Sequence, residues 1–137
     1  MRLLNDIATS YERNNQKDQA IYYYRKVLGI SPLFLEANLN ISATYFNINN
    51  IDSAFYFIDK IYSSSIQMND VLNYKEFLEA ILYAKSLEII KAERDSLSVD
   101  RMMLLVTNKS SLRQIYDKSK AENQPFAKYL LNYSKTN

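Results

Sequence analysis

The sequence predicts an all-α protein, and three observations lead to that prediction. The 137 residues include one glycine and two prolines, whereas sheets depend on tight turns that usually need these residue types. Apolar residues recur three and four positions apart over residues 71–84, as they do on one face of a helix. The chain also matches itself at a shift of 34 residues, a period typical of stacked helical hairpins.

The internal match joins residues 7–26 to residues 41–60 and comprises seven identities. Roughly one or two would be expected by chance in a window of this length. The matched pairs are Ile7 and Ile41, Tyr11 and Tyr45, Asn15 and Asn49, Asp18 and Asp52, Ala20 and Ala54, Tyr22 and Tyr56, and Lys26 and Lys60. We therefore predict two equivalent repeats, residues 1–33 and residues 34–67.

Within the two repeats we expect helices at residues 2–13, 17–29, 33–47 and 51–63. Small residues mark places where two antiparallel helices cross closely, and they are Ala8, Ala20, Ser42 and Ala54. Larger residues fill the space beside each crossing, and they are Tyr11, Tyr24, Tyr45 and Ile58. Tyr22 and Tyr56 are expected to pack on a neighbouring repeat.

The corners between these helices follow from residue chemistry. Asn15 and Asn49 stand where a helix can end in a left-handed residue. Asp18 and Asp52 fall in the first turn of the next helix, where negative charge suits the helix dipole. Pro32 is expected to start the third helix, since its missing N–H costs nothing at that position.

The second half of the chain does not continue the 34-residue register. Asn69 or Asp70 is expected to cap a long helix over residues 70–94, so residues 68–97 form a diverged third unit or a long capping helix. Three C-terminal helices are expected within residues 98–137, at 99–107, 111–121 and 125–134. The apolar run of residues 102–106 is expected in the core, and the lack of a low-complexity linker predicts a single domain over residues 1–137.

The spacing within both repeats resembles the tetratricopeptide pattern of W-x2-L-G-x2-Y, then A-x3-F, then P. The matching residues in the first repeat are Leu4, Ile7, Ala8, Tyr11, Ala20, Tyr24 and Pro32. Those in the second are Asn38, Ile41, Ser42, Tyr45, Ala54 and Ile58, with Ile66 in place of the closing proline. The resemblance covers about residues 2–66 and implies a short right-handed solenoid of antiparallel hairpins. The Asn-, Ile- and Lys-rich composition is similar to that of bacterial members of the family, and the chain can be a fragment of one.

The resemblance also implies a binding site. In tetratricopeptide arrays the first helix of each repeat lines a concave groove that holds a protein or an extended peptide. The residues that this places in the groove are Arg2, Asn5, Asp6, Thr9, Arg13, Leu39, Asn40, Ala43, Phe46 and Asn47. Family members that clamp a chaperone's C-terminal carboxylate need Lys, Asn, Asn, Lys and Arg at positions occupied here by Asn5, Thr9, Asn40, Asp70 and Tyr74. Only Asn40 matches, so we do not expect a carboxylate clamp.

The amino-acid composition excludes several kinds of catalytic and ligand-binding site. The chain has no cysteine and no histidine, which excludes thiolate metal sites and catalytic groups built on either residue. A single glycine excludes the glycine-rich phosphate loops. The carboxylates Glu76, Glu79 and Glu88 are interpreted as a solvated helix face. We therefore predict a binding scaffold rather than an enzyme, with no catalytic residue, no cofactor and no metal.

Two alternatives remain open. Residues 1–99 carry a net charge of −2 and residues 100–137 a net charge of +4. The first alternative is therefore that the C-terminal helices of residues 98–137 act as a nucleic-acid-binding or regulatory module. This alternative is less favoured, because Asp117 and Glu122 interrupt the basic residues. These basic residues are Arg101, Lys109, Arg113, Lys118, Lys120 and Lys128. The run of residues 102–106 is the expected contact of a weak homodimer if it is not in the core.

Neither a membrane span nor a compartment is indicated. The most apolar stretch, residues 77–90, is interrupted by Glu79, Lys85 and Glu88, whereas a span needs about 20 apolar residues. No apolar signal segment follows Met1. The compartment is left open between the cytoplasm and an extracytoplasmic location.

Overall fold

The computed structural model describes residues 1–64, 74–92, 100, 103–104 and 109–136. Over these residues every regular element is a helix, which confirms the all-α prediction. The chain divides into two compact units, Met1–Asp70 and Val71–Asn137, each described by itself below. The division into units leaves the prediction of a single domain untested. None of the described helices has both the length and the apolar character needed to cross a membrane.

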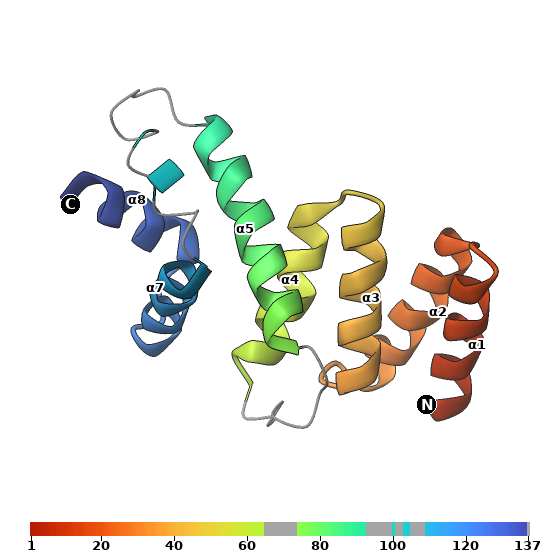
Figure 1. Cartoon of the computed structure of the whole chain (residues 1–137). Coiled ribbons are helices and arrows are strands. Elements are labelled where there is room, and N and C mark those ends of the chain that lie inside the picture. Colours follow the sequence, from red (N-terminus) through yellow and green to blue (C-terminus); the bar gives the residue numbers. More distant parts are fainter. Residues whose placement is uncertain (65–73, 93–99, 101–102, 105–108, 137) are drawn as a thin grey trace. The chain divides into compact units, whose positions relative to one another are not determined.

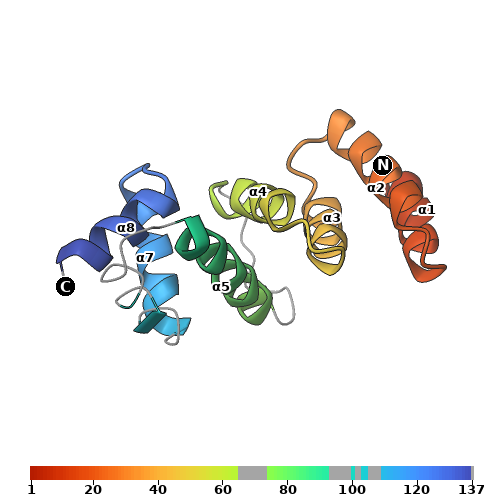
Figure 2. The same ribbon diagram turned by 90° about the horizontal axis from the view of Figure 1, so that it is seen from above.

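The first unit consists of two helical hairpins (Figures 1 and 2). Helices α1 (Arg2–Arg13) and α2 (Lys17–Ile30) form the first hairpin. Helices α3 (Leu35–Asn47) and α4 (Ile51–Tyr62) form the second, and α2 packs against α3. The predicted helix boundaries are correct to within one residue, except at the start of α3.

Both hairpins cross at small residues, as predicted. Ala8, Ala20, Ser42 and Ala54 are completely buried. The Ser42 hydroxyl donates a hydrogen bond of 2.7 Å to the backbone carbonyl of Ala54. A larger side chain at these positions would hold the two helix axes apart, since protein interiors are close-packed.

The two hairpin corners have the same backbone geometry. Asn15 and Asn49 have φ values of 59° and 64°, which confirms the predicted left-handed conformation. In the first corner the N–H of Gln16 donates to the Tyr11 carbonyl at 2.8 Å, and in the second Asn50 donates to Tyr45 at the same distance. The Asn50 side chain also caps α4 by accepting a hydrogen bond from the N–H of Ser53.

The predicted start of the third helix at Pro32 is wrong, because the helix begins at Leu35. Ser31 and Phe34 close a turn around Pro32 through a hydrogen bond of 3.1 Å from the Phe34 N–H to the Ser31 carbonyl. The buried Asn38 side chain then donates to the carbonyls of Pro32 at 3.1 Å and Phe34 at 2.8 Å. A side chain thus satisfies carbonyl groups of the turn, and proline fits its second position because its φ is already fixed.

The tyrosines divide between the core and the surface. Tyr24 is completely buried, as predicted. The prediction that Tyr22 and Tyr56 pack on a neighbouring repeat is wrong, since they are 54% and 60% exposed. Each lies beside a lysine one turn later: Lys26 Nζ is 4.8 Å from the centre of the Tyr22 ring, and Lys60 Nζ is 5.8 Å from that of Tyr56. A cation over the ring face is favourable at the surface, where no neighbouring helix is needed.

One arginine joins the two hairpins. The Arg25 guanidinium donates to the Tyr45 hydroxyl at 2.6 Å. It also lies 5.6 Å from the centre of the Tyr45 ring and 5.5 Å from that of Phe57. Tyr45 belongs to α3 and Phe57 to α4, so this single side chain of α2 contacts both helices of the second hairpin.

The second unit consists of α5 (Tyr74–Ala92), α7 (Lys109–Ala121) and α8 (Phe126–Thr136). Helices α7 and α8 form a hairpin, and both contact α5. Asn123 lies at the corner of the α7–α8 hairpin and has φ of 54°, so it has the same left-handed conformation as Asn15 and Asn49. The core contains Leu78, Ile81, Leu82, Leu112, Tyr116, Phe126 and Leu130.

The predictions for the second unit are only partly correct. Helix α7 begins two residues earlier than predicted, and α8 covers residues 126–136 rather than 125–134. The caps Asn69 and Asp70, the ends of the 70–94 helix and most of the 99–107 helix lie outside the described residues. The expected core position is wrong for Met103 and Leu104, which are 41% and 75% exposed.

Candidate functional site

The first helices of the two hairpins meet at their first turns. Arg2 Nη1 lies 3.2 Å from Glu36 Oε2, and Asn5 Nδ2 donates to the same oxygen at 3.3 Å. Arg2 and Glu36 are 34 residues apart, so they occupy equivalent positions of the two repeats. Glu36 was not predicted as a site residue. The 34-residue shift could have identified Glu36, because it aligns this acid with Arg2, a residue of opposite charge, rather than with an identical residue.

The predicted residues of α1 divide into exposed and buried groups. Arg2, Asp6 and Arg13 are exposed, and Thr9 is half-buried. The prediction that Asn5 faces a groove is wrong, because Asn5 is only 3% exposed and lies in the contact with Glu36. Thr9 donates to the Asn5 carbonyl at 2.9 Å, so its hydroxyl is already engaged within α1.

The predicted residues of α3 are less exposed as a group, but none of them is fully buried. Leu39, Asn40, Ala43 and Phe46 are half-buried, and Asn47 is exposed. Among the described residues none hydrogen-bonds to the Asn40 side chain, although its backbone carbonyl accepts from Thr44 Oγ1. Asn40, Ala43 and Asn47 follow the spacing of one helix face. They are the 34-residue equivalents of Asp6, Thr9 and Arg13.

A buried hydroxyl supports the α1 side of this face. Tyr24 Oη donates to Glu12 Oε2 at 2.8 Å and lies 3.3 Å from Thr9 Oγ1. Burial raises the pKa of Tyr24 because the ionised phenol would lose its hydration, and the Glu12 carboxylate acts in the same direction. The group is therefore a neutral hydrogen-bond donor that holds Glu12. Over the described part of the chain, acidic side chains form no group that could hold a metal ion.

The basic C-terminal residues are partly engaged inside the second unit. Arg113 Nη1 lies 3.7 Å from Glu79 Oε1, so Glu79 is not simply solvated. Lys120 lies over the Tyr116 ring at 5.5 Å, and Lys128 donates to Gln124 at 3.0 Å. Arg101 and the side chain of Lys109 lie outside the described residues. Of these described cations, Arg113 is paired with an acidic side chain, and Lys120 and Lys128 have neutral partners.

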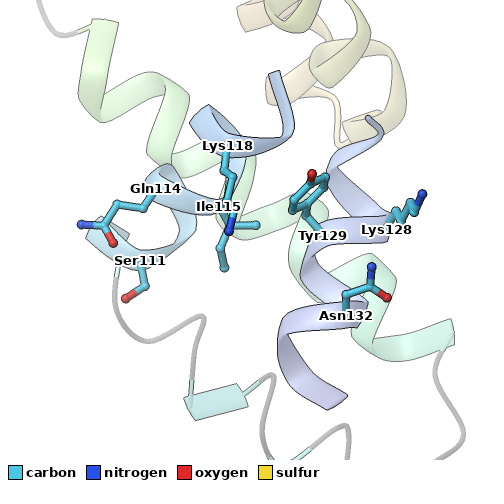
Figure 3. A pocket seen from close by; sticks show the side chains of 7 residues that line it. All are labelled: Ser111, Gln114, Ile115, Lys118, Lys128, Tyr129 and Asn132. Atoms are coloured by element: carbon cyan, nitrogen blue, oxygen red, sulfur yellow. The ribbon is translucent and has the colours of Figure 1, made fainter. Parts of the chain in front are cut away.

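A cavity of about 500 Å³ lies between α7 and α8 (Figure 3). It is in the second unit and was not predicted from the sequence. Its lining residues are Ser111, Gln114, Ile115, Lys118, Lys128, Tyr129 and Asn132. The lysines were noted only as part of a basic tail, because a sequence pattern does not show which cations face a hollow.

Comparisons with protein-family models, with curated proteins and with solved structures find no match to this chain.

Proposed function

We propose that this chain is a tetratricopeptide-like scaffold that binds another protein by holding an extended peptide along α1 and α3. The observation that carries the proposal is the contact of Arg2 and Asn5 with Glu36, because it brings together the first helices of two successive hairpins. Equivalent residues of the two repeats then form parallel rows. The pairs are Asp6 with Asn40, Thr9 with Ala43, and Arg13 with Asn47.

The chemistry of these rows suits a peptide backbone. The Asn40 amide can donate to a carbonyl and accept from an N–H. Ala43, one turn later, is small enough to let a backbone approach closely, and Phe46 adds an apolar contact. Asp6 and Arg13 are exposed and of opposite charge, which favours a ligand with little net charge.

The repeat geometry also sets a spacing for the ligand. Packed helix axes lie about 8–10 Å apart, and an extended chain advances about 3.3 Å per residue. A peptide that crosses α1 and α3 would therefore contact equivalent positions about every third residue. The proposed ligand is an extended segment with contacts at that interval.

The test is a variant that blocks the face without removing core atoms. Asn40→Arg combined with Ala43→Arg places two long side chains on half-buried positions of α3. The matched control is Gln16→Arg combined with Gln19→Arg, which adds the same charge at exposed positions of the first hairpin. Partners are captured from the native extract with the whole chain, identified by mass spectrometry, and then titrated as purified proteins.

We expect the blocked variant to bind its partner at least about tenfold more weakly, because the few central contacts of an interface carry most of its affinity. The control should bind as the original chain does. Equal binding by the blocked variant, with its helical content and melting temperature unchanged, would place the interaction elsewhere and refute the proposal.

A further inference from the structure

The cavity between α7 and α8 is separate from the residues of the proposed peptide site. It lies wholly in the second unit, and its α7 members occupy positions 111, 114, 115 and 118, which follow the spacing of one helix face. Figure 3 shows Ile115 and Lys118 on α7 facing Tyr129 on α8 across the hollow, with Gln114 and Lys128 at its outer edges.

The charge around this hollow is not balanced. None of the described residues that line it is acidic. The Lys118 side chain is exposed and forms no hydrogen bond or ion pair with any described residue, and the Lys128 ammonium group bonds only to the neutral side chain of Gln124. The described lining therefore carries the Lys118 ammonium group at the hollow and the Lys128 ammonium group at its outer edge, without a carboxylate, an arrangement that attracts an anion.

The lower part of the hollow is apolar. Ile115 is 6% exposed, so its side chain forms a firm floor, and the half-buried ring of Tyr129 provides a wall. Small-molecule sites usually measure about 300–1,000 Å³ and combine apolar walls with a few polar groups. A volume of about 500 Å³ falls within that range.

We propose that this cavity binds a small organic anion, with its carboxylate or phosphate at Lys118 and a flat apolar body between Ile115 and Tyr129. A hydrogen bond between an ammonium group and a carboxylate or phosphate is stronger than a hydrogen bond between two neutral groups. The ring of Tyr129 and the floor at Ile115 exclude water from the apolar body. The amide of Asn132 also lines the cavity and would fix the orientation of the ligand.

The experiment uses the whole chain and four probes in isothermal titration calorimetry. Phenyl phosphate and benzoate carry both an acidic group and a ring, and they distinguish phosphate from carboxylate. Inorganic phosphate tests the charge alone, and benzyl alcohol tests the ring alone. The variant is Lys118→Gln, and the matched control is Lys120→Gln, whose lysine lies over the Tyr116 ring and does not line the cavity.

We expect saturable binding of phenyl phosphate or benzoate that is at least about tenfold tighter than binding of inorganic phosphate or benzyl alcohol. Lys118→Gln should weaken it about tenfold or more, whereas Lys120→Gln should leave it unchanged. Both lysines are at least partly exposed, so neither change should disturb the fold.

Three results would overturn the proposal. They are the absence of saturable binding, equal affinity for inorganic phosphate, and equal losses in the two lysine variants, which would indicate attraction to overall charge. A duplex DNA that binds the chain and is released by Lys118→Gln and Lys120→Gln alike would also indicate a diffuse basic surface. These results are independent of the peptide site, because the Asn40→Arg, Ala43→Arg chain should bind phenyl phosphate as the original does.

Discussion

At the scale of single residues, the two repeats use equivalent positions for different tasks. Arg2 and Glu36 stand 34 residues apart and form an ion pair of 3.2 Å. Adjacent copies of one position are neighbours in space, so opposite charges there attract whereas identical charges would repel. Both side chains are largely exposed, and the pair is therefore worth little stability by itself. It joins the first turns of α1 and α3.

Replacing Tyr24 with phenylalanine should lower the free energy of unfolding by about 1–2 kcal/mol. The change removes the hydroxyl that donates to Glu12 at 2.8 Å and leaves the completely buried ring in place. Urea denaturation followed by circular dichroism measures the effect. Tyr22→Phe is the matched control, because its ring is 54% exposed and its change should stay within about 0.5 kcal/mol.

The same pair of variants has a predicted pH dependence. The pKa of Tyr24 is raised above the ordinary value of 10.0 by burial, so above that pH the unfolded chain releases a proton that the folded chain keeps. Stability from this group is complete below pH 10.0 and falls as the pH rises further. The difference between the original chain and Tyr24→Phe should therefore shrink as the pH rises above 10.0, for example to about pH 11. A constant difference would contradict the burial effect.

Residue by residue, the sequence was informative where spacing decides the environment. Tyr24 and Ala54 were correctly predicted as core because both helix faces and the repeat constrain them. Asn5 was wrongly placed on an open face, because polarity alone does not reveal that Glu36 holds its amide. The other predicted site positions are exposed or half-buried, and their role stays a prediction. Glu36, the acid that joins the two helices, was not predicted.

At the scale of elements, the left-handed asparagines end the first helix of each of three hairpins. Asn15, Asn49 and Asn123 have φ between 54° and 64°. In each case the next residue donates its N–H to a carbonyl five positions back at 2.8 Å. Hairpins in both units therefore have the same corner geometry, although the 34-residue repeat is recognisable only in the first half of the sequence.

Asn49→Ala should destabilise the chain by about 1–2 kcal/mol, because alanine is strained at φ of 64°. Asn49→Gly should be close to neutral, since glycine adopts this conformation freely. Asn47→Ala, two residues earlier and inside α3, is the control and should be neutral or slightly stabilising. Thermal unfolding by circular dichroism ranks the three variants, and equal effects of alanine and glycine at position 49 would contradict the argument.

Element boundaries were predictable where a corner residue marks them. Asn15 and Asn49 fixed the ends of α1 and α3, whereas Pro32 misled the prediction for the start of α3. Proline fits both the first turn of a helix and the second position of a β-turn. The buried Asn38 side chain, which bonds to two carbonyls of the turn, accompanies the second conformation, and no local pattern identifies it.

At the scale of the whole molecule, a single cooperative domain is still a prediction. Leu112 is 1% exposed in the second unit, and Leu112→Ala should cost about 2–5 kcal/mol. If the chain unfolds as one domain, amide hydrogen exchange should accelerate equally at Ile58 in the first unit and Leu82 in the second. Acceleration at Leu82 with none at Ile58 would show that the two units unfold independently.

Two contacts of the first unit should respond to ionic strength in opposite ways. Arg25 and Lys60 both lie over the Phe57 ring, at 5.5 Å and 5.0 Å. Burial and then the charge of Arg25 lower the pKa of Lys60, so the two cations repel each other. Added salt screens that repulsion, but it also screens the attraction between Arg2 and Glu36. Concentrated salt should therefore relieve the repulsion at Phe57 while it weakens the ion pair between Arg2 and Glu36, whose loss should cost the first unit little stability.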